Sequence, residues 1–363
     1  MKLPIDKPSP DIQWFRRVIT GEIVPERPPF AELFLDYEVT AAIAEKCLGR
    51  EWVAPSGDRE SQKAYWDNYI EVYYRTGYDY IRISGGLDFP GKFRPAEDTA
   101  ALSRGTRSWA EEGTGPIATW EDFEKYPWPS LDKVDLWYYE YASQRVPEGM
   151  GVFVCPTSGF LEIPLDILLG YENMCYLLYD NPQLVEAVFE KVGQLIYGFY
   201  EKLIGLPNLA GFFQGDDMGF KTSTLVSPDV LRKYVLPWHK KLAKLAHDHG
   251  LLYMLHACGN LESIMEDLIE DVGIDAKHSF EDAAVSVKTF KKRYGDRIGV
   301  LGGVDVDCLC RLPEKELRNY IRDILDTCML GGRYALGSGN TVTNYIPLEN
   351  YLIMLEEGWN WGK

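Results

Sequence analysis

Short apolar segments recur along the chain, and most of them are followed by a stretch whose apolar residues have helical spacing. This alternation is typical of a parallel sheet, because two parallel strands need a long, usually helical, connection between them. The predicted strands are residues 30–36, 78–84, 151–155, 209–214, 251–256, 273–278, 297–303 and 333–338. Eight such strands separated by helices predict an α/β fold, specifically a (β/α)8 TIM barrel.

Local helix signals support these units. Ser227 and Pro228 supply an N-cap and a first-turn proline, and apolar residues then follow at helical spacing as far as Trp238. Gly250 is expected to end the next helix. Further helices are predicted over residues 261–270, 287–294 and 313–329.

Two regions depart from the repeat. Residues 1–28 are rich in proline and polar residues, and we expect them to form an N-terminal arm packed on a single barrel domain of residues 29–363. Residues 85–150 form a long connection after the second strand that is rich in proline and tryptophan. A connection of this length predicts a lid-like insertion or an excursion packed by its own aromatic side chains.

Composition restricts the possible partners. The 363 residues carry a formal net charge of -17, which argues against sequence-independent binding of nucleic acid or of an anionic membrane. The N-terminal residues lack the apolar core of a secretory signal, and no apolar run is long enough to span a membrane. The seven cysteines are scattered and contain no C-x-x-C pair, as expected of reduced thiols. We therefore expect a cytoplasmic protein whose partners are small molecules or proteins.

His256 and Cys258 follow directly on the apolar run of residues 251–255. Strand side chains alternate, so these two residues share a face, and side chains at the carboxyl end of a barrel strand point into the binding crevice. An imidazole beside a thiol suggests soft-metal ligation, most plausibly of zinc. The alternative is a structural histidine and cysteine, because no further cysteine or histidine lies nearby in the sequence.

Other strand ends add candidates at the same rim. They are Asp88 after the second strand, Gln214, Asp216 and Asp217 at the fourth, His278 and Glu281 at the sixth, and Ser338, Asn340 and Tyr345 at the eighth. Asp216 and Asp217 are adjacent, so only one of them can face inward in a regular strand. His278 could equally satisfy hydrogen bonds in the core. No G-x-S-x-G elbow and no dinucleotide fingerprint is present.

Four segments of the C-terminal half carry a family resemblance. They are H-A-C-G-N at 256–260, G-I-D-A-K-H-S-F-E at 273–281, L-G-G-V-D at 301–305, and G-S-G-N at 337–340 followed by Pro347 and Leu348. In these segments the chain resembles the uroporphyrinogen decarboxylase superfamily, which includes cobalamin-dependent methyltransferases. The N-terminal half matches only through the placement of its strands.

In the methyltransferase branch, the resemblance implies zinc bound by an H-x-C pair and a later cysteine. His256 and Cys258 match the pair, but the third position falls on Ser338. A serine hydroxyl stays protonated near neutral pH and is a poor zinc ligand. If zinc is bound, its third ligand is expected to be Asp217, Glu281 or Cys155.

In the decarboxylase branch, an N-terminal motif that contains arginine and an aspartate at the end of the second strand handle a substrate with many carboxylates. The N-terminal segment here lacks that arginine motif, and Asp88 is the nearest acid. A rim rich in carboxylates repels such a substrate unless arginines compensate. The candidates for compensation are Arg82, Arg94, Arg104 and Arg107.

The resemblance implies a corrinoid-dependent methyltransferase or demethylase that acts on a small methoxylated or methylamine-type compound. No corrinoid-binding domain is recognisable, so the corrinoid is expected on a partner protein. The expected catalytic residues are His256, Asp217, His278 and Glu281, and the expected substrate-binding residues are Asp88, Gln214, Ser338, Asn340 and Tyr345. The alternatives are a uroporphyrinogen decarboxylase of porphyrin biosynthesis and a non-catalytic accessory protein that binds a metal or a corrinoid.

Overall fold

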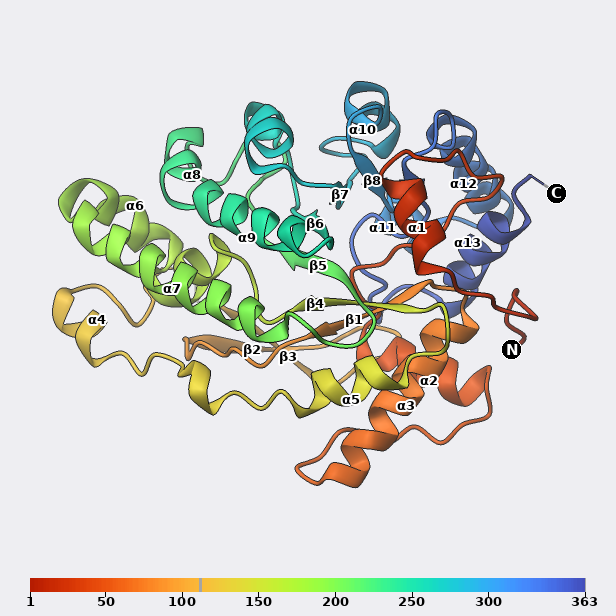
Figure 1. The fold of residues 1–363 in the computed structure, drawn as a ribbon, viewed down its shortest axis with the longest axis horizontal. Helices are drawn as coiled ribbons and strands as arrows, with labels where there is room; N and C mark the ends of the chain where they lie inside the picture. The colour runs from red at the N-terminus through yellow and green to blue at the C-terminus, as the bar shows by residue number, and fades with distance from the viewer. Residues whose placement is uncertain (111–112, 363) are drawn as a thin grey trace.

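A parallel sheet of seven strands forms the centre of the computed structural model, which describes residues 1–110 and 113–362 (Figure 1). The strand order is β1-β4-β5-β6-β7-β8-β9, and every neighbouring pair is parallel. The strands are β1 (Tyr80–Ser84), β4 (Gly151–Cys155), β5 (Leu209–Gly215), β6 (Leu252–His256), β7 (Ala276–His278), β8 (Gly299–Leu301) and β9 (Tyr334–Ala335). Each corresponds to a predicted strand, so the α/β class and its parallel sheet are confirmed.

The sheet is curled around a cluster of buried side chains. This cluster contains residues of every strand of the sheet, among them Tyr80 of β1 and Ala335 of β9, which stand at opposite edges of the strand order. Ala31 and Leu33 belong to the same cluster. Side chains from both edges can share one interior only if the sheet curls toward itself.

The predicted first strand, residues 30–36, is reduced to isolated pairings. Phe30 bridges Leu336 and Leu35 bridges Val342, both in parallel orientation, on the β9 side. On the β1 side the described residues show no ladder, and the hydroxyl of Tyr80 instead accepts from the amide of Glu32 at 3.1 Å. The backbone pairings of the described residues therefore do not form a closed ring of eight strands.

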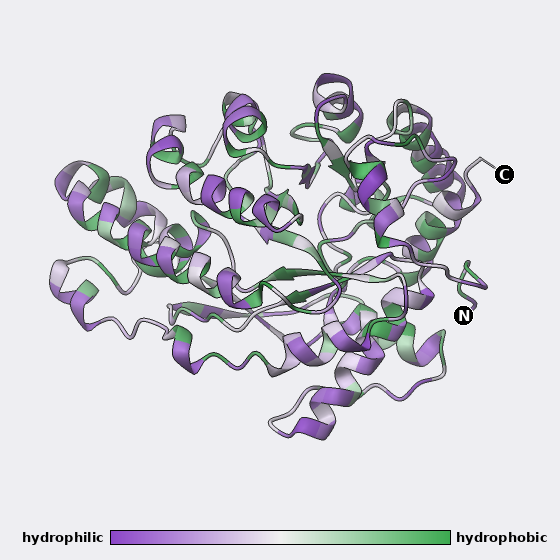
Figure 2. Ribbon diagram, viewed as in Figure 1, coloured by the Kyte–Doolittle hydropathy of each residue, from purple (hydrophilic) through white to green (hydrophobic). Residues whose placement is uncertain are grey.

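Helices cover the outside of the sheet, with apolar residues along the central strands and polar residues on the outward parts of the helices (Figure 2). Ser227 caps helix α8 (Pro228–Tyr234) by accepting from the amide of Val230, and Pro228 stands in its first turn, as predicted. The helices after β1 are α4 (Trp120–Lys125), α5 (Trp137–Arg145), α6 (Tyr171–Asp180), α7 (Pro182–Leu203), α8 (Pro228–Tyr234), α9 (Leu236–Asp248), α10 (Val287–Tyr294), α11 (Val306–Arg311), α12 (Glu314–Cys328) and α13 (Leu348–Asn360). Shorter elements are η1 (Leu131–Lys133) and η3 (Glu262–Ile264), which are 3-10 turns, and η2 (Ile163–Leu169) and η4 (Asp267–Val272), which are π-helical.

The N-terminal region contains α1 (Ile12–Ile19), α2 (Tyr37–Lys46) and α3 (Arg59–Arg75). Phe15 and Ile19 of α1 are fully buried in the cluster inside the curled sheet, and Phe15 packs edge-on against Tyr80. Helix α1 therefore covers one end of the interior. The chain termini lie on the same side of the molecule (Figure 1).

The long connection after β1 has secondary structure of its own. Its strands β2 (Phe93–Glu97) and β3 (Thr106–Ala110) pair antiparallel. Arg107 of β3 forms an ion pair with Asp98 at 3.0 Å, and Asp98 accepts from the side-chain amide of Asn344. The hairpin is thereby tied to the loop that follows β9.

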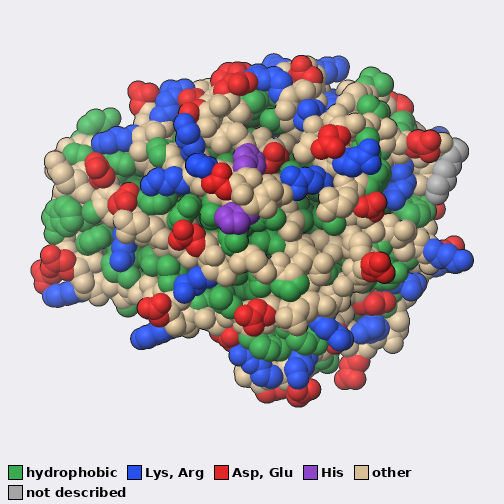
Figure 3. All heavy atoms as spheres, in the orientation of Figure 1, with side chains coloured by type: hydrophobic (Ala, Val, Ile, Leu, Met, Phe, Trp, Pro, Cys, Tyr) green, Lys and Arg blue, Asp and Glu red, His purple; other side chains and the backbone are tan. Residues whose placement is uncertain are grey.

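Within the described residues, no helix combines the length and the apolarity needed to cross a membrane. On the face shown in Figure 3, basic and acidic side chains are interspersed and form no single patch of either sign.

Candidate metal centre and cavity

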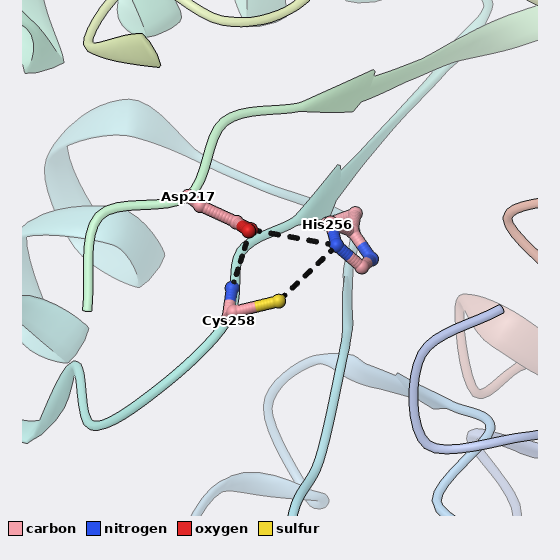
Figure 4. A group of neighbouring side chains, drawn as sticks. All are labelled: Asp217, His256 and Cys258. Carbon is pink, nitrogen blue, oxygen red and sulfur yellow. Dashed lines mark hydrogen bonds and ion pairs between the residues drawn. The ribbon is translucent and has the colours of Figure 1, made fainter. Parts of the chain in front are cut away.

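Asp217, His256 and Cys258 bring three potential metal ligands together, with their ligand atoms all within 4.8 Å of one another. The Cys258 sulfur lies 3.5 Å from Nε2 of His256, and an Asp217 oxygen lies 3.4 Å from the same nitrogen. Figure 4 shows the three side chains pointing toward one another from the loop after β5 and from the end of β6. The structure thus places His256 and Cys258 side by side and adds Asp217.

The strand register and a close loop contact hold this group. Gly215 of β5 pairs with His256 of β6, and the amide of Cys258 donates to Asp217 at 2.8 Å. Gly259 has a φ of 77°, and a Cβ atom there would stand 2.3 Å from the backbone of Gly219. Only glycine fits this approach, so the H-A-C-G-N sequence shapes the turn that presents the cysteine.

Two donors converge on the Cys258 sulfur. The hydroxyl of Ser279 lies 3.3 Å from it, and Nδ2 of Asn340 lies 3.2 Å from it. Burial raises the pKa of the Cys258 thiol, and the nearby Asp217 carboxylate raises it further. A bound cation reverses this effect, because a coordinating thiol loses its proton. The two donors then stabilise the thiolate.

Asp217 is ionised in this setting. Burial alone raises the pKa of its carboxyl, but hydrogen bonding to His256 and the amide of Cys258 prevail and lower it to about 2. Imidazole nitrogen, thiolate sulfur and carboxylate oxygen are the three donor types of protein zinc sites, and three protein ligands leave a fourth position for a substrate atom. The residues present therefore fit a catalytic zinc ion.

His278 contacts the His256 ring on the side of its Nδ1 atom. Its Nδ1 lies 2.8 Å from Nδ1 of His256, and its side chain is completely buried. Burial lowers the pKa of His278 well below its usual value, as does the neighbouring His256, so His278 is neutral. With its proton on Nε2, His278 can accept from Nδ1–H of His256, which leaves Nε2 of His256 free to ligate.

The group faces a cavity of about 610 Å³. His256, Asp217 and Asn340 line it, together with Arg82 and Glu162. Aromatic side chains form another part of its wall, namely those of Phe34, Tyr65, Trp66 and Tyr69. The cavity thus combines a potential metal centre with an apolar surface, as small-molecule sites commonly do.

Asp216 and Asp217 have opposite environments, as their adjacency predicted. Asp216 is completely buried and accepts from the amides of Leu161 and Glu162 and from Nε2 of His239 at 2.7 Å. Its carboxylate joins α9 to the segment after β4, away from the ligand group.

Two predicted site residues, Glu281 and Asp88, are exposed and lie outside the ligand group. Asp88 does not line the cavity either.

Two further candidates, Tyr345 and Gln214, are engaged elsewhere. The ring of Tyr345 lies beneath the guanidinium of Arg107, outside the cavity wall. Gln214 is buried and accepts from the hydroxyl of Tyr200 at 2.6 Å. Asn340, by contrast, reaches both the cavity and the Cys258 sulfur.

Ser338 is held by a buried glutamate. The amide of Ser338 donates to Oε1 of Glu32 at 2.6 Å, and its hydroxyl lies 2.5 Å from Oε2. Burial raises the pKa of Glu32 to about 8, although the hydrogen bonds with Ser338 act in the opposite direction. Glu32 is therefore protonated at neutral pH, and Ser338 does not belong to the ligand group.

We predict that Glu32 makes the protein less stable as the pH rises. Between about pH 4.5 and pH 8 the unfolded chain ionises this carboxyl while the folded chain keeps it protonated, so the free energy of unfolding falls across this window. Glu32→Gln mimics the protonated carboxyl and cannot ionise, so it lacks this pH-dependent loss of stability. Its stability relative to wild type should rise by a few kcal/mol between about pH 5 and pH 8 in denaturant titrations. A difference that is independent of pH would contradict the assignment.

Sequence reasoning did not select Glu162, and it named Arg82 only as an arginine that could compensate the charge of a polycarboxylate substrate. Glu162 precedes the π-helical segment η2, and burial raises the pKa of its carboxyl, as do Asp217 and Asp216. No motif marks it. Arg82 is a charged residue inside the otherwise uncharged strand β1, and that irregularity is a signal that the sequence does contain.

The chain is similar in sequence to a known methyltransferase. A methylated-thiol–coenzyme M methyltransferase of Methanosarcina mazei is 26% identical over 250 residues, which cover 65% of this chain and 62% of that relative. The alignment thus spans less than two thirds of the relative's length.

Solved structures resemble the fold. A methyltransferase from Methanosarcina mazei superimposes with a TM-score of 0.68 over 96% of this chain and 98% of that chain, at 14% identity. A putative vitamin-B12 independent methionine synthase from Listeria monocytogenes gives a TM-score of 0.50 over 98% of both chains, at 11% identity. These two structures support the fold alone.

The family resemblance seen in the C-terminal segments is confirmed over a longer stretch. The sequence profile of uroporphyrinogen decarboxylase (URO-D) matches residues 116–359. This match covers more than half of the chain, which therefore belongs to the uroporphyrinogen decarboxylase (URO-D) family.

Proposed function

We propose that this protein is a corrinoid-dependent methyltransferase that removes the methyl group of a small donor and passes it to a corrinoid held by a separate protein. The observation that carries the proposal is the group of Asp217, His256 and Cys258 beside the cavity. The similarity to the methylated-thiol–coenzyme M methyltransferase supports methyl transfer as the reaction type.

The residues of the chain divide the work of this reaction. Asp217, His256 and Cys258 would hold zinc, and a bound zinc ion would supply the positive charge that stabilises the electron pair left on the heteroatom of the donor. His278 fixes the orientation of the His256 ring, and Asn340 and Ser279 fix that of the Cys258 sulfur. The aromatic part of the cavity wall holds the donor and excludes water.

A porphyrinogen decarboxylase places different demands on the cavity. Several arginines must face the carboxylates of its substrate, because buried unpaired charges are costly. Among the described residues that line this cavity, Arg82 is the arginine present. Arg104 pairs with Asp36 and Glu38, and Arg107 pairs with Asp98. Their engagement favours methyl transfer over decarboxylation.

Methyl transfer can be tested with the purified protein and reduced cobalamin in place of the corrinoid protein. We expect methylcobalamin to form, detected by its absorbance, with a methoxylated, methylamine-type or methylated-thiol donor. Removal of metal by a chelator should abolish the reaction, and added zinc should restore it, whereas magnesium should not. Formation of coproporphyrinogen from uroporphyrinogen would establish the decarboxylase alternative. Tight binding of donors without turnover would favour an accessory protein.

A further inference from the structure

Arg82 is a buried cation in the cavity wall that has no carboxylate partner among residues 1–110 and 113–362. Its side chain is only 6% exposed. Nε donates to the carbonyl oxygen of Phe213 at 2.9 Å, and Nη1 donates to the hydroxyl of Ser84 at 2.7 Å. Both partners are neutral, so they orient the guanidinium but leave its charge uncompensated.

The placement of Arg82 relative to the ligand group follows from the strand register. Phe213 stands two residues before Gly215 on β5, and Gly215 pairs with His256. A strand rises about 3.3 Å per residue, so His256 lies about 7 Å farther along the strands than the guanidinium contact. Arg82 therefore stands deeper in the cavity than the ligand group, and both face the same space.

The aromatic part of the cavity wall suits a flat apolar body. Tyr65, Trp66 and Tyr69 of α3 line it, and the hydroxyl of Tyr69 is turned away to the carbonyl oxygen of Arg82 at 3.0 Å. A benzene ring with substituents in para positions can pack on such rings while it holds an anionic group at one end and a methylated heteroatom at the other.

We propose that Arg82 binds the carboxylate or sulfonate group of a small aromatic methyl donor and so selects anionic donors over neutral or cationic ones. The planar fork of a guanidinium matches such oxyanions, and the contacts of Nε and Nη1 hold the fork in place before the donor binds. The donor class rests on the proposed function, but anion binding at Arg82 can be measured without any methyl transfer. The selection favours methoxylated over methylamine-type compounds.

Calorimetry with matched probes tests the site. The zinc-loaded wild-type protein should bind para-methoxybenzoate about 10- to 100-fold more tightly than para-methoxybenzamide, which has the same shape without the charge. Arg82→Gln should abolish this preference. Arg82→Lys should retain part of it, because the charge remains and the fork is lost. Arg107→Gln, which changes an arginine outside the cavity wall, should bind as wild type does. Para-methoxybenzenesulfonate shows whether sulfonate replaces carboxylate.

The outcomes separate this proposal from the proposed function. Equal binding of acid and amide by the wild type, or tighter binding of a methylamine-type cation, overturns the role of Arg82 even if methyl transfer is observed. A preference for the acid that Arg82→Gln removes supports the role even if no methyl donor turns over. Thermal unfolding checks that Arg82→Gln is folded. If it is not, Ser84→Ala keeps the charge but frees Nη1, and should weaken binding of the acid and not of the amide.

Discussion

His256→Ala is expected to release zinc from the purified protein and to lower the rate of methylcobalamin formation by more than about 100-fold. Changes to residues that merely support a metal ligand already cost about 10- to 100-fold in affinity or activity, so loss of one of three ligands should cost more. The imidazole contacts both other members of the group, at 3.5 Å from the Cys258 sulfur and 3.4 Å from an Asp217 oxygen.

The measurements are metal content by mass spectrometry and methylcobalamin formation by absorbance. His249→Ala is the matched control, because His249 is exposed and its ring contacts the carbonyl oxygen of Leu245, outside the ligand group. Cys258→Ser should behave like His256→Ala, since a hydroxyl replaces the thiolate. Full zinc content together with full activity in His256→Ala would refute the metal centre.

The parallel sheet could be predicted because its strands are short buried runs with little polar content. The predicted strand 151–155 coincides with β4, and the predicted strand 209–214 differs from β5 by one residue. Residues 30–36 have the same apolar pattern but form only isolated bridges. A segment joins a sheet only where the adjacent strand can pair with it, and its own sequence does not determine that. The β2–β3 hairpin escaped prediction because its residues are mainly exposed and it contains Pro95.

The site could be predicted in part for the same reason. The alternation of side chains along a strand predicted that His256 and Cys258 share a face. Beyond the end of a strand this alternation no longer predicts where a side chain points. Glu281 is exposed and lies outside the ligand group, and its catalytic role stays a prediction. Glu162 could not be found at all, because the contact of its segment with Asp216 spans more than fifty residues and depends on the packing of η2. Arg82 could have been selected, because a charged residue within an otherwise buried strand needs a partner or a ligand of opposite charge.

The adjacent aspartates Asp216 and Asp217 should respond to alanine substitution in opposite ways. Asp216→Ala leaves the amides of Leu161 and Glu162 and the ring of His239 without their buried acceptor, so we expect a loss of about 3–5 kcal/mol in the free energy of unfolding. Asp217→Ala removes the acceptor of the Cys258 amide and the contact with His256 from a half-buried position, and should cost only about 1 kcal/mol.

Zinc binding should be affected more by Asp217→Ala than by Asp216→Ala, the reverse of their effects on stability. Asp217→Ala should lose the metal while the protein remains folded, whereas folded Asp216→Ala at low temperature should keep it, because Asp216 does not belong to the ligand group. Urea titrations of both variants in chelator give the stabilities without a contribution from bound metal. Equal destabilisation by the two substitutions, or zinc loss in Asp216→Ala alone, would mean that the two carboxylates have been assigned the wrong way round.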